Sequence, residues 1–248
     1  MEISNTWDRF KNHLEEIKGN LAGFRGYNIV REIPLYEVHH HPFYIDYAYK
    51  IYNNHTRIDI KNWKLSMTHS PHGYYLMGES YYSDSFKLND ILTSASMMKC
   101  NHHYFKYQSL AKQEFKNFDH IVELGGGCGD MAKFIRNMGY KQKYTIIDLP
   151  EVLPILEFNL YGYNIDLTTK PVISNDKSIL FISTWGISEC PIKWRDEVLN
   201  TLKPTNWLIA YQRKFENIDN AKYFQQLEGI REDFPVLNWD GGSEYILK

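Results

Sequence analysis

The sequence predicts an α/β protein with a mostly parallel, doubly wound sheet, preceded by a mainly helical region. After residue 118, short apolar runs alternate with helical stretches, and near-continuous apolar strands are typical of a parallel sheet covered on both faces. Before residue 115, aromatic and histidine-rich segments show no regular alternation. We therefore expect two domains, residues 1–115 and 116–248.

The expected elements follow from the apolar periodicity. Residues 5–19 are expected to form an amphipathic helix, and residues 90–113 a long helix with a break near Asn101. Strands are expected over 121–124, 144–148, 172–174, 179–184 and 207–212, with helices over 130–138, 151–160, 193–202 and 221–233. The segments 236–239 and 244–248 flank Asp240-Gly241-Gly242 and are expected to close the chain as an antiparallel hairpin.

Composition excludes several classes of protein. The 248 residues include 28 Lys+Arg and 30 Asp+Glu, so the chain lacks the basic excess typical of nucleic-acid binding. No apolar run approaches the ~20 residues of a membrane span, and the N-terminus lacks the apolar core of a secretory signal. Three widely spaced cysteines favour a reducing compartment. We expect a cytoplasmic protein without nucleic-acid or membrane partners, with a homodimer left open.

A glycine-rich turn follows the first expected strand, in the stretch HIVELGGGCGDMAKFI (120–135). Such turns commonly hold a nucleotide. A triphosphate-binding loop places a lysine directly after its glycines, whereas the first lysine here is Lys133, within the expected helix. The dinucleotide spacing Gly127-x-Gly129-x-x-Ala132 fits formally, but it would place Asp130 where a pyrophosphate needs amide donors.

A second spacing uses every other position: Glu123-x-Gly125-x-Gly127-x-Gly129. It resembles motif I of the class I S-adenosylmethionine-dependent methyltransferases. The resemblance implies a Rossmann-like fold, S-adenosylmethionine as cofactor and S-adenosylhomocysteine as product. Glycines let the backbone pass close to the ligand, and Glu123 suits the cationic amino group of the methionine moiety.

Asp148 ends the second expected strand, where an acidic side chain can accept both ribose hydroxyls. Dinucleotide-binding folds use the same device, so Asp148 indicates a ribose and not a particular cofactor. The alternative is a helix cap ahead of Pro150-Glu151, because proline favours the first helical turn.

The fourth expected strand leads into FISTWGISECP (181–191), which lacks the Asp/Asn-Pro-Pro-Tyr/Phe motif of amine methyltransferases. Together with ELGGGCG and TIIDLPEVLPI, the segment FISTWGISE resembles a bacterial family of sugar O-methyltransferases. The resemblance covers roughly 118–212. It implies O-methylation of a small polar acceptor, with a sugar or nucleotide-sugar precursor of a surface polysaccharide as the leading class. Residues 1–115 are expected to be an acceptor-binding or lid region, because the irregular Gly/Ser/Tyr-rich stretch around His69 and His72 is typical of a functional loop.

The expected cofactor site combines the glycine turn with the ends of neighbouring strands. Its residues are Glu123, Gly125, Gly126, Gly127, Gly129, Asp148, Leu149, Asn175, Ser183, Thr184 and Trp185.

A sugar hydroxyl is a poor nucleophile and calls for a general base. Glu189 lies just past the fourth expected strand, although it could equally hold its loop in place. His69 and His72 share a Gly/Ser/Tyr-rich segment, and each could instead be structural. The sequence lacks a His-Glu-x-x-His or Cys-x-x-Cys pattern, so we expect no metal.

Two alternatives to this function remain. A dehydrogenase that uses NAD could share the same fold. The chain could also be a non-catalytic, methyltransferase-like partner subunit, although the intact Glu123, glycine and Asp148 set argues against that interpretation.

Overall fold

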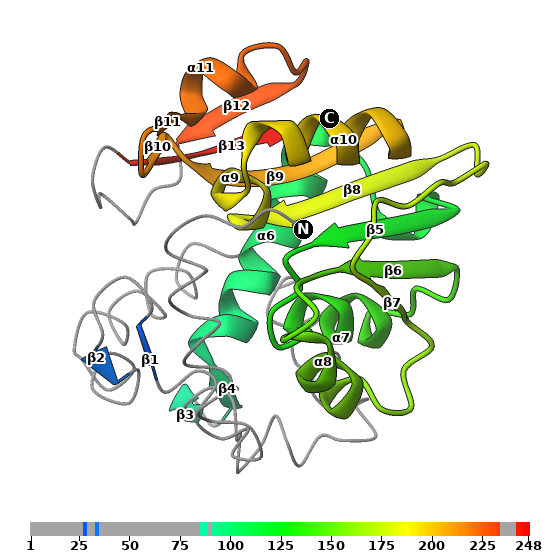
Figure 1. The fold of residues 1–248 in the computed structure, drawn as a ribbon. Helices are drawn as coiled ribbons and strands as arrows, with labels where there is room; N and C mark the ends of the chain where they lie inside the picture. The colour runs from blue at the N-terminus through cyan, green and yellow to red at the C-terminus, as the bar shows by residue number, and fades with distance from the viewer. Residues whose placement is uncertain (1–26, 29–32, 35–84, 89–90, 234–241) are drawn as a thin grey trace. The chain divides into compact units, whose positions relative to one another are not determined.

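The computed structural model of the chain describes residues 27–28, 33–34, 85–88, 91–233 and 242–248 (Figure 1). The helix expected over 5–19 and the strand expected over 236–239 lie outside these residues. The described chain divides into two compact units. One holds residues 106–127 and 141 onwards, and the other holds the residues up to 105 together with 128–140.

The first unit contains a seven-stranded sheet in the order β12-β13-β9-β8-β5-β6-β7 (Figure 1). Its strands are β5 (His120–Leu124), β6 (Lys143–Ile147), β7 (Asp166–Thr168), β8 (Ile179–Thr184), β9 (Asn206–Gln212), β12 (Ile230–Asp233) and β13 (Ser243–Leu247). Strands β5 to β9 pair in parallel, while β13 runs antiparallel to both β9 and β12.

One face of this sheet packs against α10 (Ile192–Leu202). Trp194, Val198 and Leu202 recur at helical spacing and contact the inward side chains of β5, β8 and β9. The short helices α9 (Gly186–Glu189) and α11 (Asn220–Phe224) add Ile187 and Phe224 to the same cluster.

The opposite face of the sheet carries α8 (Leu153–Asn159), as Figure 1 shows. The end of α6 (Ala95–Ala111) belongs to the same unit. There the buried Tyr107 packs against Phe115 and Phe118, and its hydroxyl donates a hydrogen bond to the Lys248 carbonyl at 2.8 Å. Phe115 opens a 3-10 turn, η2 (Phe115–Asn117). Helices therefore cover both faces, and the predicted fold class is confirmed: a Rossmann-like, mostly parallel, doubly wound sheet with a terminal antiparallel hairpin.

The remaining described elements are short or belong to the second unit. They are β1 (Tyr27–Asn28), β2 (Ile33–Pro34), β3 (Ser85–Leu88), β4 (Ile91–Ser94), α7 (Asp130–Asn137), β10 (Lys214–Phe215) and β11 (Ile218–Asp219).

Two expected helices differ from the structure. The helix expected from residue 90 begins at Ala95, because residues 91–94 pair with β3 as β4, and it continues through Asn101. The helix expected over 221–233 ends at Phe224, and residues 230–233 form β12 instead, since they pair with β13. An antiparallel pair, β12 with β13, closes the described chain as expected, while the strand expected over 236–239 lies outside the described residues.

The third strand of the parallel sheet was also wrongly placed. It is β7, which pairs with β6 through Leu167, whereas residues 172–174 belong to a loop in which Ile173 is 77% exposed. The turn after β8 had been expected as a loop and contains α9. A short run such as Val172-Ile173 carries no information about its pairing partner, which is why periodicity alone selected the wrong segment.

Candidate functional site

The order of strands changes direction between β5 and β8. From β5 the chain proceeds to β6 and β7 on one side, and then returns to β8 on the other side of β5. In open α/β sheets, ligands bind in the crevice outside the carboxyl ends of the strands at such a switch point. The glycine-rich turn begins at this edge, directly after Leu124, the last residue of β5.

The backbones that leave β5 and β8 touch at this edge. A Cβ added to Gly186 would lie 2.6 Å from the Leu124 carbonyl oxygen, and one added to Gly125 would lie 2.9 Å from the Gly186 Cα. Real side chains do not tolerate such distances, so this contact requires glycine at both positions. Gly186 was not among the residues expected in the site, because the Ser-Thr-Trp-Gly segment gives no hint of its contact with β5.

The glycine turn itself needs a backbone that other residues rarely adopt. Gly125, Gly127 and Gly129 have φ angles of +82°, +56° and +79°. Gly126 is constrained differently, since an added Cβ would lie 2.6 Å from Cγ2 of Ile146 on β6. The turn therefore presents bare backbone, and the alternate spacing of the glycines follows from alternate left-handed residues. Gly129 then serves as the N-cap of α7 in the second unit.

Asp148, the residue after β6, ties that strand to the glycine turn. Its Oδ2 accepts a hydrogen bond from the Gly127 amide at 3.0 Å, and its Oδ1 accepts one from the Leu149 amide at 2.8 Å. The pKa of Asp148 is raised to about 6, because the effect of burial exceeds the opposing effect of the hydrogen bonds from the amides of Gly127, Leu149 and Gly126. A carboxylate offers about four acceptor positions, so the buried group retains capacity for another donor.

Glu123 lies on β5 with its side chain buried, on the face opposite α10. The hydroxyl of Tyr144 on β6 donates a 2.7 Å hydrogen bond to Glu123 Oε2, and Tyr144 is itself 1% exposed. A charge-assisted hydrogen bond of this kind stabilises a carboxylate away from bulk water. Tyr144 was missed from the sequence, because its relation to Glu123 depends on the register of β5 and β6.

Ser183 ends the buried part of β8 and links three segments. Its hydroxyl donates to the Leu124 carbonyl at 2.9 Å and accepts from the Ile187 amide at 2.8 Å. The side chain thus holds the end of β5 against the first turn of α9. The neighbouring Thr184 is half-buried and pairs with Ala210 of β9.

Trp185 has a φ angle of +72°, which is unusual for a bulky side chain and costs about 1–3 kcal/mol. Hydrogen bonds hold this conformation: its amide donates to the Ala210 carbonyl at 2.7 Å, and its carbonyl accepts from the Ser188 amide at 2.9 Å. The indole Nε1 reaches Ser243 Oγ at 3.5 Å, at the start of β13. The strained residue therefore lies at the carboxyl edge of β8.

Glu189 ends α9 and is half-buried. Its Oε1 accepts a 2.8 Å hydrogen bond from Nε2 of Gln212, the last residue of β9. This contact agrees with the interpretation that Glu189 holds its turn. The expected bases His69 and His72 lie outside the described residues.

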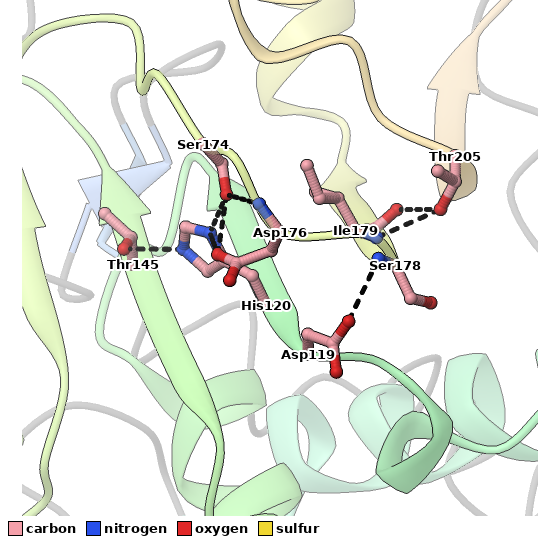
Figure 2. Close-up of polar contacts among 8 residues, drawn as sticks. All are labelled: Asp119, His120, Thr145, Ser174, Asp176, Ser178, Ile179 and Thr205. Carbon is pink, nitrogen blue, oxygen red and sulfur yellow. Dashed lines mark hydrogen bonds and ion pairs between the residues drawn. The ribbon is translucent and has the colours of Figure 1, made fainter.

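The structure does not bring Asn175 to this edge. The neighbouring Ser174 and Asp176 both contact His120, the first residue of β5, at 3.0 and 3.3 Å from Nδ1 (Figure 2). Asn175 is exposed beside them, at the amino ends of the parallel strands. The reason is the misplaced third strand: residues 172–174 precede β8, so Asn175 does not follow the carboxyl end of a strand.

His120 is fully buried at this amino edge, between Thr145 and Ser174 (Figure 2). The Ser174 hydroxyl donates a hydrogen bond to Asp176 Oδ2 at 2.7 Å. Nδ1 of His120 is therefore protonated and is the donor in the hydrogen bond to Ser174 Oγ. Nε2 then accepts from the Thr145 hydroxyl at 2.9 Å. Burial, and then the charge of Lys143, lower the pKa of His120.

Two general features of the described residues bear on function. None of their helices is both long and apolar enough to traverse a bilayer. Within the same part of the chain, His, Cys, Asp and Glu side chains do not gather in groups of three or more that could hold a metal ion.

No protein-family model matches the sequence, and no curated protein matches it significantly. Among solved structures, a chain of the complex that contains the Haloferax volcanii Trm112 methyltransferase activator is similar, with a TM-score of 0.45 and 14% identity over 61% of this chain and 90% of that chain. An S-adenosylmethionine-dependent methyltransferase from Aquifex aeolicus gives a TM-score of 0.38 and 13% identity over 52% and 80% of the two chains.

Human N-acetylserotonin methyltransferase in complex with S-adenosylmethionine is also similar, with a TM-score of 0.36 and 20% identity over 47% of this chain and 35% of that chain. Identities of this size do not carry an activity from one protein to another. The function therefore has to be argued from the residues of this chain.

Proposed function

We propose that the chain is an S-adenosylmethionine-dependent O-methyltransferase for a small polar acceptor. The observation that carries the proposal is the buried Asp148 carboxylate bonded to the glycine turn, at the sheet edge where Gly125 and Gly186 touch. Bare backbone and a carboxylate with spare acceptor capacity fit a nucleoside without phosphates. The spacing Glu123-x-Gly125-x-Gly127-x-Gly129 favours a sulfonium nucleoside over a dinucleotide.

In the proposed site, each residue has a binding task. Asp148 accepts hydrogen bonds from the ribose hydroxyls, and Leu149 lies beside it at the end of β6. Glu123, supported by Tyr144, balances the cationic amino group of the methionine moiety. Gly125, Gly126, Gly127 and Gly129 allow close approach of the backbone. The human structure similar to this chain contains S-adenosylmethionine, which agrees with the expected cofactor.

When bound, S-adenosylmethionine supplies an electrophilic methyl group on a sulfonium, and the protein supplies alignment and exclusion of water. Ser183, Thr184 and Trp185 are proposed to line the cofactor at the end of β8. On the acceptor side, a hydroxyl nucleophile must lose its proton as it attacks. Glu189, His69 and His72 are the proposed bases, with residues 1–115 as the acceptor-binding or lid region.

The proposed acceptor class is a sugar, a nucleotide sugar or a related phosphorylated precursor of a bacterial surface polysaccharide. Support for it comes from the resemblance of the segments 123–129, 145–155 and 181–189 to sugar O-methyltransferases. The net charge of -2 agrees with a small-molecule acceptor in preference to a nucleic acid.

Cofactor titration by calorimetry tests the first part of the proposal. We expect saturable S-adenosylhomocysteine binding and no heat with NAD, whereas the reverse result would indicate an oxidoreductase. The second part is tested by incubating methyl-labelled S-adenosylmethionine with separate pools of sugars, nucleotide sugars and phosphorylated metabolites. Label recovered in a sugar-containing product supports the proposed acceptor class. Label found only in another pool would contradict it and would identify the compounds of that pool as the acceptors.

A further inference from the structure

Arg195 of α10 is fully buried and takes part in none of the roles proposed above. Its guanidinium donates to three uncharged oxygens: the Ser188 carbonyl at 2.6 Å, the Cys190 carbonyl at 2.7 Å and Asn220 Oδ1 at 2.6 Å. Two of these acceptors are carbonyls at the end of α9. A buried cation that caps the carbonyl end of a helix is favourably placed with respect to the helix dipole.

Asn220 of α11 extends the same set of contacts. While its Oδ1 accepts from Arg195, its Nδ2 donates to the Ser188 carbonyl at 3.2 Å and to the Gln212 carbonyl at 2.8 Å. The Asn220 side chain is fully buried as well. Arg195 and Asn220 thus join α10, the end of α9, the start of α11 and the end of β9 in one hydrogen-bonded network.

The network reaches the acceptor-side candidates through Gln212. The Gln212 side chain donates to Glu189 at 2.8 Å, and its oxygen contacts the Ser188 hydroxyl. That hydroxyl in turn donates to the carbonyl of the strained Trp185 at 2.6 Å. The backbone conformation of Trp185 and the side-chain position of Glu189 therefore both depend on the segment that Arg195 caps.

We infer that Arg195, together with Asn220, is a positioning pair that fixes residues 185–189 for the acceptor side of methyl transfer. This inference rests on the proposed function. Arginine suits the task because its planar fork can satisfy two backbone carbonyls and an amide oxygen at once, which a lysine ammonium cannot match in geometry. The ring faces of Tyr223 and Phe224, 5.0 and 5.6 Å from the guanidinium carbon, hold the fork in place.

The test uses Arg195→Met, Arg195→Lys and Asn220→Ala in the full chain. Arg231→Met is the matched control, since Arg231 also donates to backbone carbonyls at a helix end, those of Phe224 and Leu227 at 2.7 and 3.0 Å. Three quantities are measured for each: amide exchange over residues 186–190, the Kd of S-adenosylhomocysteine, and label transfer from S-adenosylmethionine to the pool that accepts it.

For Arg195→Met we expect exchange over 186–190 to accelerate at least about tenfold. Turnover should fall by a similar factor, while the S-adenosylhomocysteine Kd and the KM for S-adenosylmethionine stay within about threefold. Arg195→Lys should recover part of the turnover, and Arg231→Met should match the wild type. Asn220→Ala should follow Arg195→Met to a smaller extent, and it decides the question if Arg195→Met does not fold.

Unchanged exchange over 186–190 in a folded variant would overturn the inference. So would a loss of cofactor affinity parallel to the loss of turnover, because the effect would then lie in the cofactor site. A wild-type protein that binds no S-adenosylhomocysteine would refute the proposed function instead, and the exchange rates alone would then decide whether Arg195 fixes the turn.

Discussion

Gly125 and Gly186 meet backbone to backbone at the carboxyl edge of the sheet, where an added Cβ on Gly125 would lie 2.9 Å from the Gly186 Cα. The two residues leave β5 and β8, the strands on either side of the switch point. The close contact leaves no room for a side chain between the glycine turn and the segment that leads into α9.

The substitution Gly186→Ala tests this contact. Gly186 lacks a positive φ angle, so alanine adds only steric conflict with the Leu124 carbonyl, 2.6 Å from its Cβ. We expect the free energy of unfolding in urea to fall by about 1–3 kcal/mol, the usual cost of overpacking. S-adenosylhomocysteine affinity should fall as well.

Gly139→Ala is the control for that variant. Its φ of +94° makes alanine costly in stability, yet an added Cβ would meet no atom within 4 Å. It should therefore lose stability without losing ligand affinity. An unaltered midpoint of unfolding in Gly186→Ala would contradict the contact.

Asp148→Ala should weaken S-adenosylhomocysteine binding by roughly 1–3 kcal/mol, because the ribose hydroxyls would lose a buried acceptor. Isothermal calorimetry measures the change. Asp219→Ala is a suitable control, since Asp219 also accepts a backbone hydrogen bond, from the Lys222 amide at 3.0 Å, but does so at the start of α11. Equal affinities of the Asp148 variant and the wild type would remove Asp148 from the cofactor site.

Cofactor affinity should also depend on pH. Burial raises the pKa of Asp148 to about 6, and hydroxyl donors of a ligand favour the ionised carboxylate. Affinity is therefore expected to fall as the pH drops below about 6, by up to about tenfold per pH unit. Asp148→Asn has no carboxylate to titrate at this position and should show a flatter profile between pH 7 and 5. Parallel profiles for the two proteins would refute the assignment.

The lowered pKa of His120 predicts that this residue makes the folded state less stable as the pH falls. Its folded pKa lies below the unfolded value of 6.5, so the native state favours the neutral ring. The stabilisation is present above pH 6.5 and is lost as the pH falls through the lower, folded pKa. Asp148 has the opposite effect on stability as the pH falls. Because its pKa is raised in the native state, the native state binds a proton at a higher pH than the unfolded state does, and this stabilises it.

The comparison of wild type with His120→Gln isolates the histidine contribution, since the Asp148 contribution is common to both. Urea midpoints measured from pH 7.5 to 5 should fall less steeply for the variant. Identical slopes would mean that the pKa of His120 is the same in the folded and unfolded states, which would contradict the prediction.

Tyr144→Phe removes the hydroxyl that donates to the buried Glu123 carboxylate. We expect a loss of about 1–3 kcal/mol in unfolding free energy, because a buried charged acceptor loses its partner, together with weaker S-adenosylhomocysteine binding. Tyr211→Phe removes a comparable hydroxyl contact with Glu244 in the terminal hairpin. That control should lose stability only, and an equal drop in affinity for both variants would argue against a local effect of Tyr144.

His72→Ala tests the proposed general base. Turnover should fall by about 10²-fold or more, the usual contribution of general-base catalysis, with little change in S-adenosylhomocysteine affinity. Label-transfer rates and calorimetry on the same preparation separate the two effects. Turnover equal to that of the wild type would leave Glu189 and His69 as the remaining candidates.

The sequence by itself determined the fold class and the glycine turn. Both follow from short-range sequence patterns. Apolar runs of strand length predict β5, β8 and β9, and glycine at every second position reflects the alternate left-handed residues of the turn. The position of Asp148 could also be predicted from the sequence, because it lies at the end of a strand that the periodicity identifies.

The tertiary structure alone decided which distant segments meet. The pairing of β7 with β6 moved the third strand and left Asn175 at the amino edge, and the pairing of β12 with β13 replaced an expected helix. The register of β5 and β6 brought the Tyr144 hydroxyl within hydrogen-bonding distance of the Glu123 carboxylate. The contact of Gly125 with Gly186 and the cap that Arg195 forms on α9 have the same origin: they depend on partners far apart in sequence, which local periodicity does not encode.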